Sequence, residues 1–563
     1  MKRAISLLII FAAAFFSLQA QAEPLRASRT ASDVYINDID VWLSAYNIND
    51  NNYFKLRELA AALSGTSAAF DVRWNEAENR IELTTGIDYS GTDAGNSSNS
   101  VRETAYPTDS ALVVDGRTVE ITAYNINDNN YYKLRDLGEV IPFDVYWSEE
   151  KNSVCVYTEL GNGMTLTSGS GEMRHMSLNS STRNWQTPTK SYIFRDGDSL
   201  CVVDADTENN VINIDTYDSD YNLTGTRTVN MELPVFGAFY AGENYNYIAL
   251  GQENPEEDDS KEVIRIIKYD KDFNRLASVS VNDCYTVIPF DAGCPKMCES
   301  ENGKELVLHT SRERYLTEDG LNHQSQLTVI IDTDSMTVKN SLGQFQPNHV
   351  SHSFNQFVLY DGDSHVLLDH GDAYPRGVVL NKYSGGSYSE SILLDIPGNT
   401  GNNYTGVSVG GFAVSENNYI AAANALGFES LGDSSFPTMP STDETRDIVI
   451  LTCERGDINN TSSIRLTDYS NSGLCASLPY LVDLENGYFM VLWQEFNAGV
   501  SFSHSKALKY AVIDENGALA DKIYSAPLRL SMDCQPILDG DKVVWYTNSV
   551  MGRLFSSVNI PLQ

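Results

Sequence analysis

Alternating apolar and polar positions predict a pair of strands near the start of the chain and a second pair further on. Residues 34–41 and residues 112–121 each alternate around a short polar turn, as half-buried antiparallel strands do. Residues 53–63 and 131–140 follow these pairs and carry leucines at helical spacing. We therefore expect a helix after each strand pair.

The same order of elements occurs twice because the sequence itself is duplicated. Residues 45–53, Ala-Tyr-Asn-Ile-Asn-Asp-Asn-Asn-Tyr, recur without change 78 residues later. Each copy continues with Lys-Leu-Arg and then with Phe-Asp-Val-x-Trp, after which a further apolar run completes a second hairpin. The Asn-rich cluster indicates a turn, because Asn and Asp cap their own backbone. The sequence thus predicts two α+β units of the order ββαββ, at residues 33–86 and 108–158.

The motif Ala-Tyr-Asn-Ile-x-x-Asn-Asn-Tyr-x-Lys-Leu-Arg, followed by Phe-Asp-Val-x-Trp, extends over about residues 33–158 in its two copies. It resembles the copper amine oxidase N-terminal domain family, also called the stalk domain. The resemblance implies a small module of exported proteins that serves as a spacer or surface attachment and binds no copper. That family often has Gly in the Asn-rich turn, where this chain has Asp50 and Asp128, and Asp tolerates the same backbone. Trp74 and Trp147 are then expected at equivalent positions of the core.

The amine oxidase itself is not expected in this chain. Asn-Tyr-Asn-Tyr at residues 244–247 resembles the tetrapeptide in which copper amine oxidases convert a tyrosine into their quinone cofactor. That chemistry needs a copper ion held by a His-x-His pair and a third His, and the sequence has no His-x-His pair. A tyrosine-rich strand is the simpler interpretation. We expect neither a metal nor a cofactor in the protein.

Residues 191–563 consist of short β-branched and aromatic runs separated by Gly, Asp and Asn. Segments of about 50–60 residues with about four strands each predict an all-β domain, a β-propeller of six or seven blades. The blades are expected to begin near residues 191, 236, 290, 352, 406, 477 and 532. A pair of β-sandwiches is the alternative fold. The composition of residues 159–190, rich in Gly, Ser, Thr and Asn, indicates a linker, from which one strand is expected to close the ring.

Composition narrows the range of partners. The chain carries 76 acidic and 39 basic residues, a formal charge of −37, while 42% of its residues are hydrophobic. The hydrophobic content is sufficient for a folded core. The charge repels phosphate backbones and anionic wall polymers, so we expect no nucleic-acid partner. Eight Cys are too widely spaced for a disulfide framework, and their pairing stays open. Cys294 and Cys298 are close together but have no second pair or His at zinc-binding spacing.

The first 22 residues have the pattern of an export signal. Lys2 and Arg3 precede an apolar run over residues 4–18, and Ala-Gln-Ala at residues 20–22 supplies the small residues that a signal peptidase accepts. The apolar run is shorter than the roughly 20 residues that cross a bilayer. We expect cleavage after residue 22, no transmembrane anchor after cleavage, and a secreted, extracellular or surface-associated product.

One segment concentrates candidate chemistry, because four of the eight His fall within residues 349–370. His352, His370, Asp372 and Arg376 form the candidate ligand site. Imidazoles, a carboxylate and a guanidinium at the mouth of a ring would bind a polar ligand. A metal site and a structural role in buried turns are the alternatives.

These patterns together predict a non-catalytic protein whose stalk modules present a propeller to a glycan, a peptide or a protein. A secreted polysaccharide hydrolase or lyase that acts in the propeller channel is the alternative. Two facing carboxylates in that channel would favour the enzyme.

Overall fold

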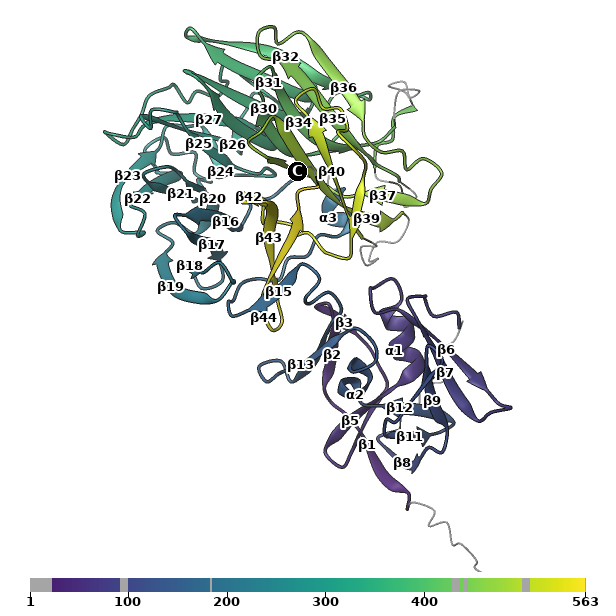
Figure 1. Cartoon of the computed structure of the whole chain (residues 1–563). Coiled ribbons are helices and arrows are strands. Elements are labelled where there is room, and N and C mark those ends of the chain that lie inside the picture. The colour runs from purple at the N-terminus through teal and green to yellow at the C-terminus, as the bar shows by residue number, and fades with distance from the viewer. Residues whose placement is uncertain are drawn as a thin grey trace, which may run out of the picture. The chain divides into compact units, whose positions relative to one another are not determined.

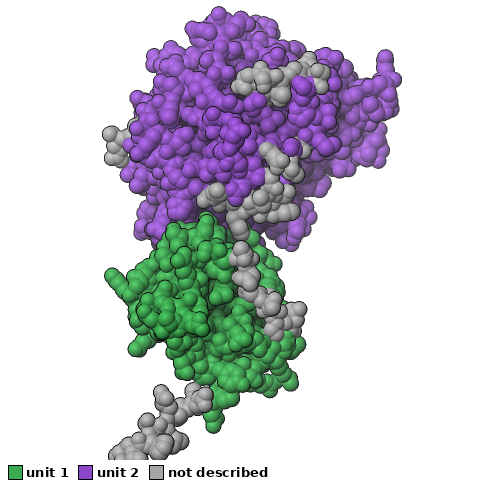
Figure 2. All heavy atoms as spheres, turned by 90° about the vertical axis from the view of Figure 1, so that its right-hand side faces the viewer, with its two compact units in different colours: residues 1–158 green, residues 159–563 purple. Residues whose placement is uncertain are grey.

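The computed structural model describes residues 23–91, 100–182, 185–427, 435–439, 441, 444–498 and 507–561. The predicted export signal at residues 1–22 lies outside these ranges. The chain divides into two compact units, unit 1 up to Thr158 and unit 2 from Glu159 (Figures 1 and 2). In the described part of the chain, no helix is long and apolar enough to cross a membrane.

Unit 1 contains one order of elements twice: a leading strand, four strands in two hairpins, a helix and a last hairpin. The first copy consists of β1 (Leu25–Arg29), β2 (Asp33–Ile36), β3 (Ile39–Val41), β4 (Ala45–Ile48), β5 (Asn51–Lys55), α1 (Leu56–Leu63), β6 (Phe70–Asn75) and β7 (Arg80–Thr85). The second copy consists of β8 (Arg102–Pro107), β9 (Ala111–Val114), β10 (Arg117–Val119), β11 (Ala123–Ile126), β12 (Asn129–Tyr132), α2 (Leu134–Gly138), β13 (Asp144–Ser148) and β14 (Ser153–Tyr157).

The predicted order ββαββ is wrong because it omits one hairpin in each copy. The omitted hairpins are β4–β5 and β11–β12, which lie directly before the helices. The Asn-Asp pairs at residues 49–50 and 127–128 are their two-residue turns, and both residues of each pair have positive φ. This is the backbone of a type I′ turn, whose twist matches the flanking strands. Because these strands take up residues assigned to the predicted helices, α1 begins only at Leu56 and α2 at Leu134.

The two copies exchange hairpins. β9 of the second copy pairs in parallel with β7 of the first, in a sheet of the order β10-β9-β7-β6. In the same way β2 of the first copy pairs in parallel with β14 of the second, in the sheet β13-β14-β2-β3. The hairpins β4–β5 and β11–β12 join β1 and β8 in a closed barrel. Each copy therefore covers strand edges that the other copy would leave open.

One hydrophobic cluster, built from both copies, forms the main core of unit 1. Leu59 of α1 and Leu137 of α2 are equivalent positions, and both are fully buried in it. Trp74 and Trp147 do not belong to this cluster, because their side chains are 45% and 38% exposed. Their expected core position is wrong. Both lie on the outermost strand of their sheet, one residue pair from the hairpin turn.

Unit 2 consists of seven antiparallel sheets within the described ranges, and its short helix α3 (Leu178–Ser181) precedes the second sheet. The first sheet combines β15 (Met164–Thr167) with β42 (Ile537–Asp539), β43 (Lys542–Ser549) and β44 (Gly552–Asn559). The next two sheets are β16 (Ser191–Asp196), β17 (Ser199–Asp206), β18 (Val211–Tyr217) and β19 (Leu223–Asn230), then β20 (Val235–Ala241), β21 (Asn246–Gly251), β22 (Ile264–Tyr269) and β23 (Arg275–Val281).

The other four sheets follow in sequence order. They are β24 (Thr286–Pro289), β25 (Lys296–Glu299), β26 (Glu305–Leu316), β27 (Asn322–Asp332) and β28 (Thr337–Val338), then β29 (Ser353–Asp361), β30 (Ser364–Asp372), β31 (Arg376–Ser384) and β32 (Ser387–Asp395). The last two are β33 (Val407–Val414), β34 (Asn418–Ala425), β35 (Asp447–Glu454) and β36 (Thr461–Arg465), then β37 (Leu474–Ala476), β38 (Tyr480–Asp483), β39 (Tyr488–Asn497), β40 (Ala507–Asp514) and β41 (Tyr524–Ala526).

These sheets follow one another around a propeller-like ring rather than forming two packed sheets (Figure 1). Buried hydrophobic clusters join each neighbouring pair from the sheet of β16 to the sheet of β39. β38 contacts β42 of the first sheet, and the buried Arg553 of β44 pairs with Asp204 of β17, which closes the ring. β16, β20, β29 and β33 begin within one residue of the predicted blade starts.

Residues 159–190 belong to unit 2 and are not a linker. β15 pairs with β44 at the outer edge of the first sheet, as expected for the strand that closes the ring. The chain then crosses to the sheet of β34, where Asn424 Nδ2 donates to the carbonyl of Ser181 at 3.1 Å and Arg446 Nη2 donates to that of Thr182 at 3.2 Å. These side chains, far away in the sequence, satisfy backbone carbonyls of a segment that forms little regular secondary structure.

Candidate binding sites

The structure brings two of the four predicted site residues of unit 2 into contact. Nδ1 of His352 lies 2.9 Å from Oδ1 of Asp372, the last residue of β30. Asp372 is fully buried, and His352 is partly exposed. Neither carboxylate oxygen of Asp372 accepts a well-formed hydrogen bond from the described residues. The imidazole of His352 is therefore the ionisable side chain in contact with this buried carboxylate.

His370 has a structural role. Its Nδ1 lies 3.1 Å from Oδ1 of Asn355, and its Nε2 lies 2.8 Å from Oγ1 of Thr405. Burial lowers the pKa of His370 to about 3, with a further contribution from the positive charges of Arg446 and Arg376. A neutral imidazole with both nitrogens engaged and no exposed surface has no capacity left for a ligand.

Arg376 binds the chain rather than a ligand. Its guanidinium donates to four backbone carbonyls, those of Asp372 and Pro397 at 3.0 Å, of Asn402 at 2.7 Å and of Tyr404 at 3.0 Å. These bonds hold the segment after β32 against the start of β31. His370 and Arg376 thus do not join His352 and Asp372 in one site.

A residue that the sequence does not single out, His323 at the start of β27, completes the exposed part of this cluster. Its ring lies nearly parallel to that of His352, with the centroids 6.3 Å apart. Its Nε2 lies 2.7 Å from Oδ2 of Asp319, and hydrogen bonds from Thr317 and His323 lower the pKa of that carboxyl to about 2. The backbone N–H of His352 donates to the backbone carbonyl of Gln324 at 3.1 Å. This hydrogen bond joins two segments that no sequence motif connects.

A cavity of about 50 Å³ lies on the inner side of the ring, where residues of β25, β29, β33 and β38 line it. Residues 186–189 lie in it, and Thr189 Oγ1 is 3.3 Å from the thiol of Cys294. Asp533 is the one carboxylate among the described residues that line it, and Arg174 lies 2.7 Å from that carboxylate. Burial nevertheless raises the pKa of Asp533 to about 6. None of the four predicted site residues lines this cavity.

The described ranges contain neither a disulfide nor a cluster of metal-binding side chains. All eight Cys lie in these ranges and are free thiols, six of them buried. No group of three or more His, Cys, Asp or Glu side chains in the described part of the chain could hold a metal ion.

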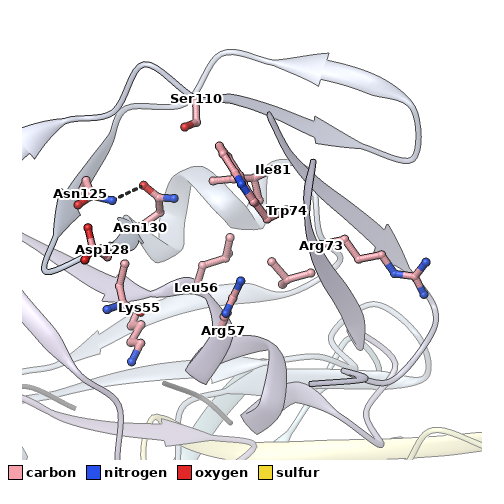
Figure 3. A pocket seen from close by; sticks show the side chains of 12 residues that line it. Lys55, Leu56, Arg57, Arg73, Trp74, Ile81, Ser110, Asn125, Asp128 and Asn130 are labelled. Atoms are coloured by element: carbon pink, nitrogen blue, oxygen red, sulfur yellow. Dashed lines mark hydrogen bonds between the residues drawn. The ribbon is translucent and has the colours of Figure 1, made fainter. Parts of the chain in front are cut away.

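Unit 1 has a pocket of about 390 Å³ to which both copies of the repeat contribute (Figure 3). Leu56 of α1, Val72 of β6 and Ile81 of β7 form its apolar part, beside the exposed indole of Trp74. The turn of the second copy faces them with the side chains of Asn125, Asp128, Asn129 and Asn130.

The amides of this turn are held in place by hydrogen bonds within it. Nδ2 of Asn125 donates to Oδ1 of Asn130 at 3.5 Å (Figure 3), and Nδ2 of Asn129 donates to the carbonyl of Asn127 at 2.7 Å. The remaining amide donors and acceptors are available to the pocket.

A second pocket, of about 220 Å³, repeats this arrangement with the copies exchanged. Leu134, Val145, Trp147 and Val154 of the second copy correspond to the residues named for the first pocket, and the turn at residues 50–52 comes from the first copy. Asn47 and Asn52 form the same amide hydrogen bond, at 3.2 Å, and Asn51 donates to the carbonyl of Asn49 at 2.7 Å. The duplicated positions therefore build one pocket twice.

Each pocket has an arginine at the same repeat position, Arg57 or Arg135. Both are exposed, and neither has a carboxylate within ion-pair distance among the described residues. Arg73 differs from them, because it extends away from the other labelled side chains in Figure 3 and its Nε lies 3.2 Å from Oδ2 of Asp71. The repetition of Trp, Arg and Asn was visible in the sequence, but their convergence depends on the exchanged hairpins.

Comparisons with known proteins show only distant similarity. No family model matches the chain, and no curated protein matches it. Among solved structures it is similar to a prolyl endopeptidase (8% identity, 68% of this chain and 52% of that chain, TM-score 0.37). It is also similar to a lectin from Burkholderia pseudomallei (8% identity, 67% and 96%, TM-score 0.39) and to a Fusarium graminearum α-L-arabinofuranosidase (12% identity, 69% and 97%, TM-score 0.31). The chain thus spans about half the length of the prolyl endopeptidase. These similarities are low, and no function is transferred from them.

Proposed function

We propose that this chain is an exported, non-catalytic protein of the cell surface or extracellular space that binds a carbohydrate polymer. Its unit 1 would consist of two stalk-type repeats that carry the binding sites, and its unit 2 would be a seven-bladed β-propeller. The observation that carries the proposal is the pair of equivalent pockets in unit 1.

The chemistry of these pockets suits sugar rings. An exposed indole stacks on the C–H face of a sugar, and its edges tolerate water. Side-chain amides both donate to and accept from hydroxyl groups, as the turn residues facing Trp74 can do. The two pockets repeat this combination, which fits a ligand that is itself a repeating polymer.

The alternative function, a hydrolase or lyase in the ring channel, has less support. Glycoside hydrolysis uses two carboxyl groups that flank the bond to be cleaved. Asp533 is the one carboxylate in the described lining of the cavity on the inner side of the ring, and Arg174 lies 2.7 Å from it. The cavity of about 50 Å³ is also small for a sugar.

Binding of soluble polysaccharides, measured by affinity electrophoresis and calorimetry, tests the proposal. The variant with Trp74→Ala and Trp147→Ala should bind at least about tenfold more weakly than the unchanged protein. Trp42→Ala is the matched control, because Trp42 is 58% exposed in the same unit and lines neither pocket. Equal binding by the double variant and the unchanged protein would contradict the proposal.

A further inference from the structure

We infer that the polymer is an acidic polysaccharide and that Arg57 and Arg135 bind its carboxylate or phosphate groups, one in each pocket. This inference rests on the proposed function and names the ligand class of the same two pockets. It is carried by the position of two arginines at one repeat position, next to the two exposed indoles.

The formal charge of −37 repels an anionic polymer at long range, so its binding depends on local contacts with Arg57 and Arg135. With 76 acidic and 39 basic residues, an exposed arginine has many carboxylates to pair with. Arg73 pairs with Asp71, and Arg80 pairs with Glu82. Arg57 and Arg135 form no such pair with the described residues, although each is the second residue of a helix and is followed directly by an acidic residue. Each pocket thus has one guanidinium without an ion pair among the described residues, and such a group is a suitable partner for an anionic ligand.

The guanidinium selects particular anions. Its planar fork binds a carboxylate or a phosphate through two parallel hydrogen bonds, which an ammonium group does not. In Figure 3 the side chain of Arg57 lies below Leu56 and Trp74, on the side away from Ser110. A sugar stacked on the indole would then have the guanidinium at one end.

The opposite wall of each pocket orients the ligand. Asp128 in the first pocket and Asp50 in the second stand in the turn that faces the indole. A carboxylate there repels the acidic group of the sugar and accepts hydrogen bonds from its hydroxyls. The acidic substituent is therefore directed to the arginine, and the neutral edge of the ring to the Asn-rich turn.

Two equivalent pockets favour a polymer over its single repeat unit. Once one pocket is filled, other repeats of the same chain are present at high local concentration, so the polymer binds more tightly without any new contact. Because the arginines are exposed, salt weakens this binding by screening the charges.

The experiment compares three soluble polysaccharides of similar length on the full chain: polygalacturonate, a phosphomannan and neutral β-1,4-galactan. We expect an anionic polymer to bind more tightly than galactan and the difference to shrink as salt is raised. Preference between the first two polymers identifies carboxylate or phosphate as the group bound. Arg57→Gln and Arg135→Gln should each weaken binding about fivefold and together about 25-fold. Arg117→Gln, an equal change of charge at an exposed position of unit 1 outside both pockets, should leave it unchanged.

Other outcomes separate this inference from the proposed function. If galactan binds as tightly as the anionic polymers, and the tryptophan variants but not the arginine variants lose binding, the acidic ligand is wrong and the carbohydrate function stands. If none of the polymers binds, both are wrong. If poly-glutamate binds as tightly as polygalacturonate, the pockets recognise acidic chains in general, and the carbohydrate class is wrong.

Discussion

Phe54 of β5 is paired directly with Tyr132 of β12, and the two residues occupy the same position in the two copies of the repeat. A residue that pairs with its own equivalent lies on an approximate twofold axis between the copies. The exchanged hairpins and the two composite pockets follow from this one symmetry. The duplication thus produced an interlocked unit rather than two modules in a row.

The exposure of the pocket tryptophans predicts a small effect on stability. Trp74→Ala and Trp147→Ala should each lower the free energy of unfolding of unit 1 by about 1 kcal/mol or less, because no buried cavity is created. Leu59→Ala and Leu137→Ala, at fully buried positions of the same core, should each cost about 2–5 kcal/mol. Urea denaturation followed by circular dichroism compares the four variants. A tryptophan variant as unstable as the leucine variants would contradict the exposed position.

Closure of the ring depends on Arg553 at the end of the chain. Its Nη1 lies 2.8 Å from Oδ2 of Asp215, its Nη2 also pairs with Asp204, and the arginine is fully buried. Arg553→Met leaves two buried carboxylates without their cation, and we expect unit 2 to lose about 3–5 kcal/mol.

Denaturation followed by the fluorescence of the buried Trp493 and Trp545 measures this loss. Arg275→Met is the control in the same unit, since the Arg275–Glu232 pair is partly exposed and should contribute less than about 1 kcal/mol. Equal stability of Arg553→Met and the unchanged protein would show that other contacts close the ring.

Burial of His370 predicts that acid destabilises unit 2. The pKa of His370 is lowered to about 3 in the folded protein, so below about pH 6.5 the unfolded chain binds a proton that the folded protein does not. The stabilising contribution of the neutral imidazole is complete above about pH 6.5. It is lost as the pH falls towards 3, by at most about 1.4 kcal/mol per pH unit.

His370→Gln removes this titration, and its free energy of unfolding should fall less steeply between pH 6 and 4 than that of the unchanged protein. Thr337→Ser, a change of a non-titrating group at an exposed position of unit 2, is the control and should keep the original slope. Parallel pH profiles for His370→Gln and the unchanged protein would contradict the buried, neutral state.

Residues 349–376 have some contacts that follow from the sequence and others that depend on how the sheets pack. The clustering of His352, His370, Asp372 and Arg376 in the sequence was real, and the contact between His352 and Asp372 follows from the adjacent strands. Whether an imidazole faces a neighbouring sheet or solvent depends on how the sheets pack. His370 therefore became a buried hydrogen-bonding group. His323, which precedes His352 by 29 residues, became the partly exposed neighbour of His352.

The sequence by itself determined the duplication, the turns at residues 49–50 and 127–128, and the starts of several sheets of the ring. These features depend on local backbone preferences and on the period of apolar residues, both of which act over a few positions. Tertiary structure alone decided which copy's hairpin completes each sheet. It thereby decided that Trp74 faces the Asn-rich turn of the other copy and stays exposed. The physical reason is that the backbone N–H and C=O groups at a strand edge can bond to any strand of matching register. The packing of the whole unit therefore selects the partner strand.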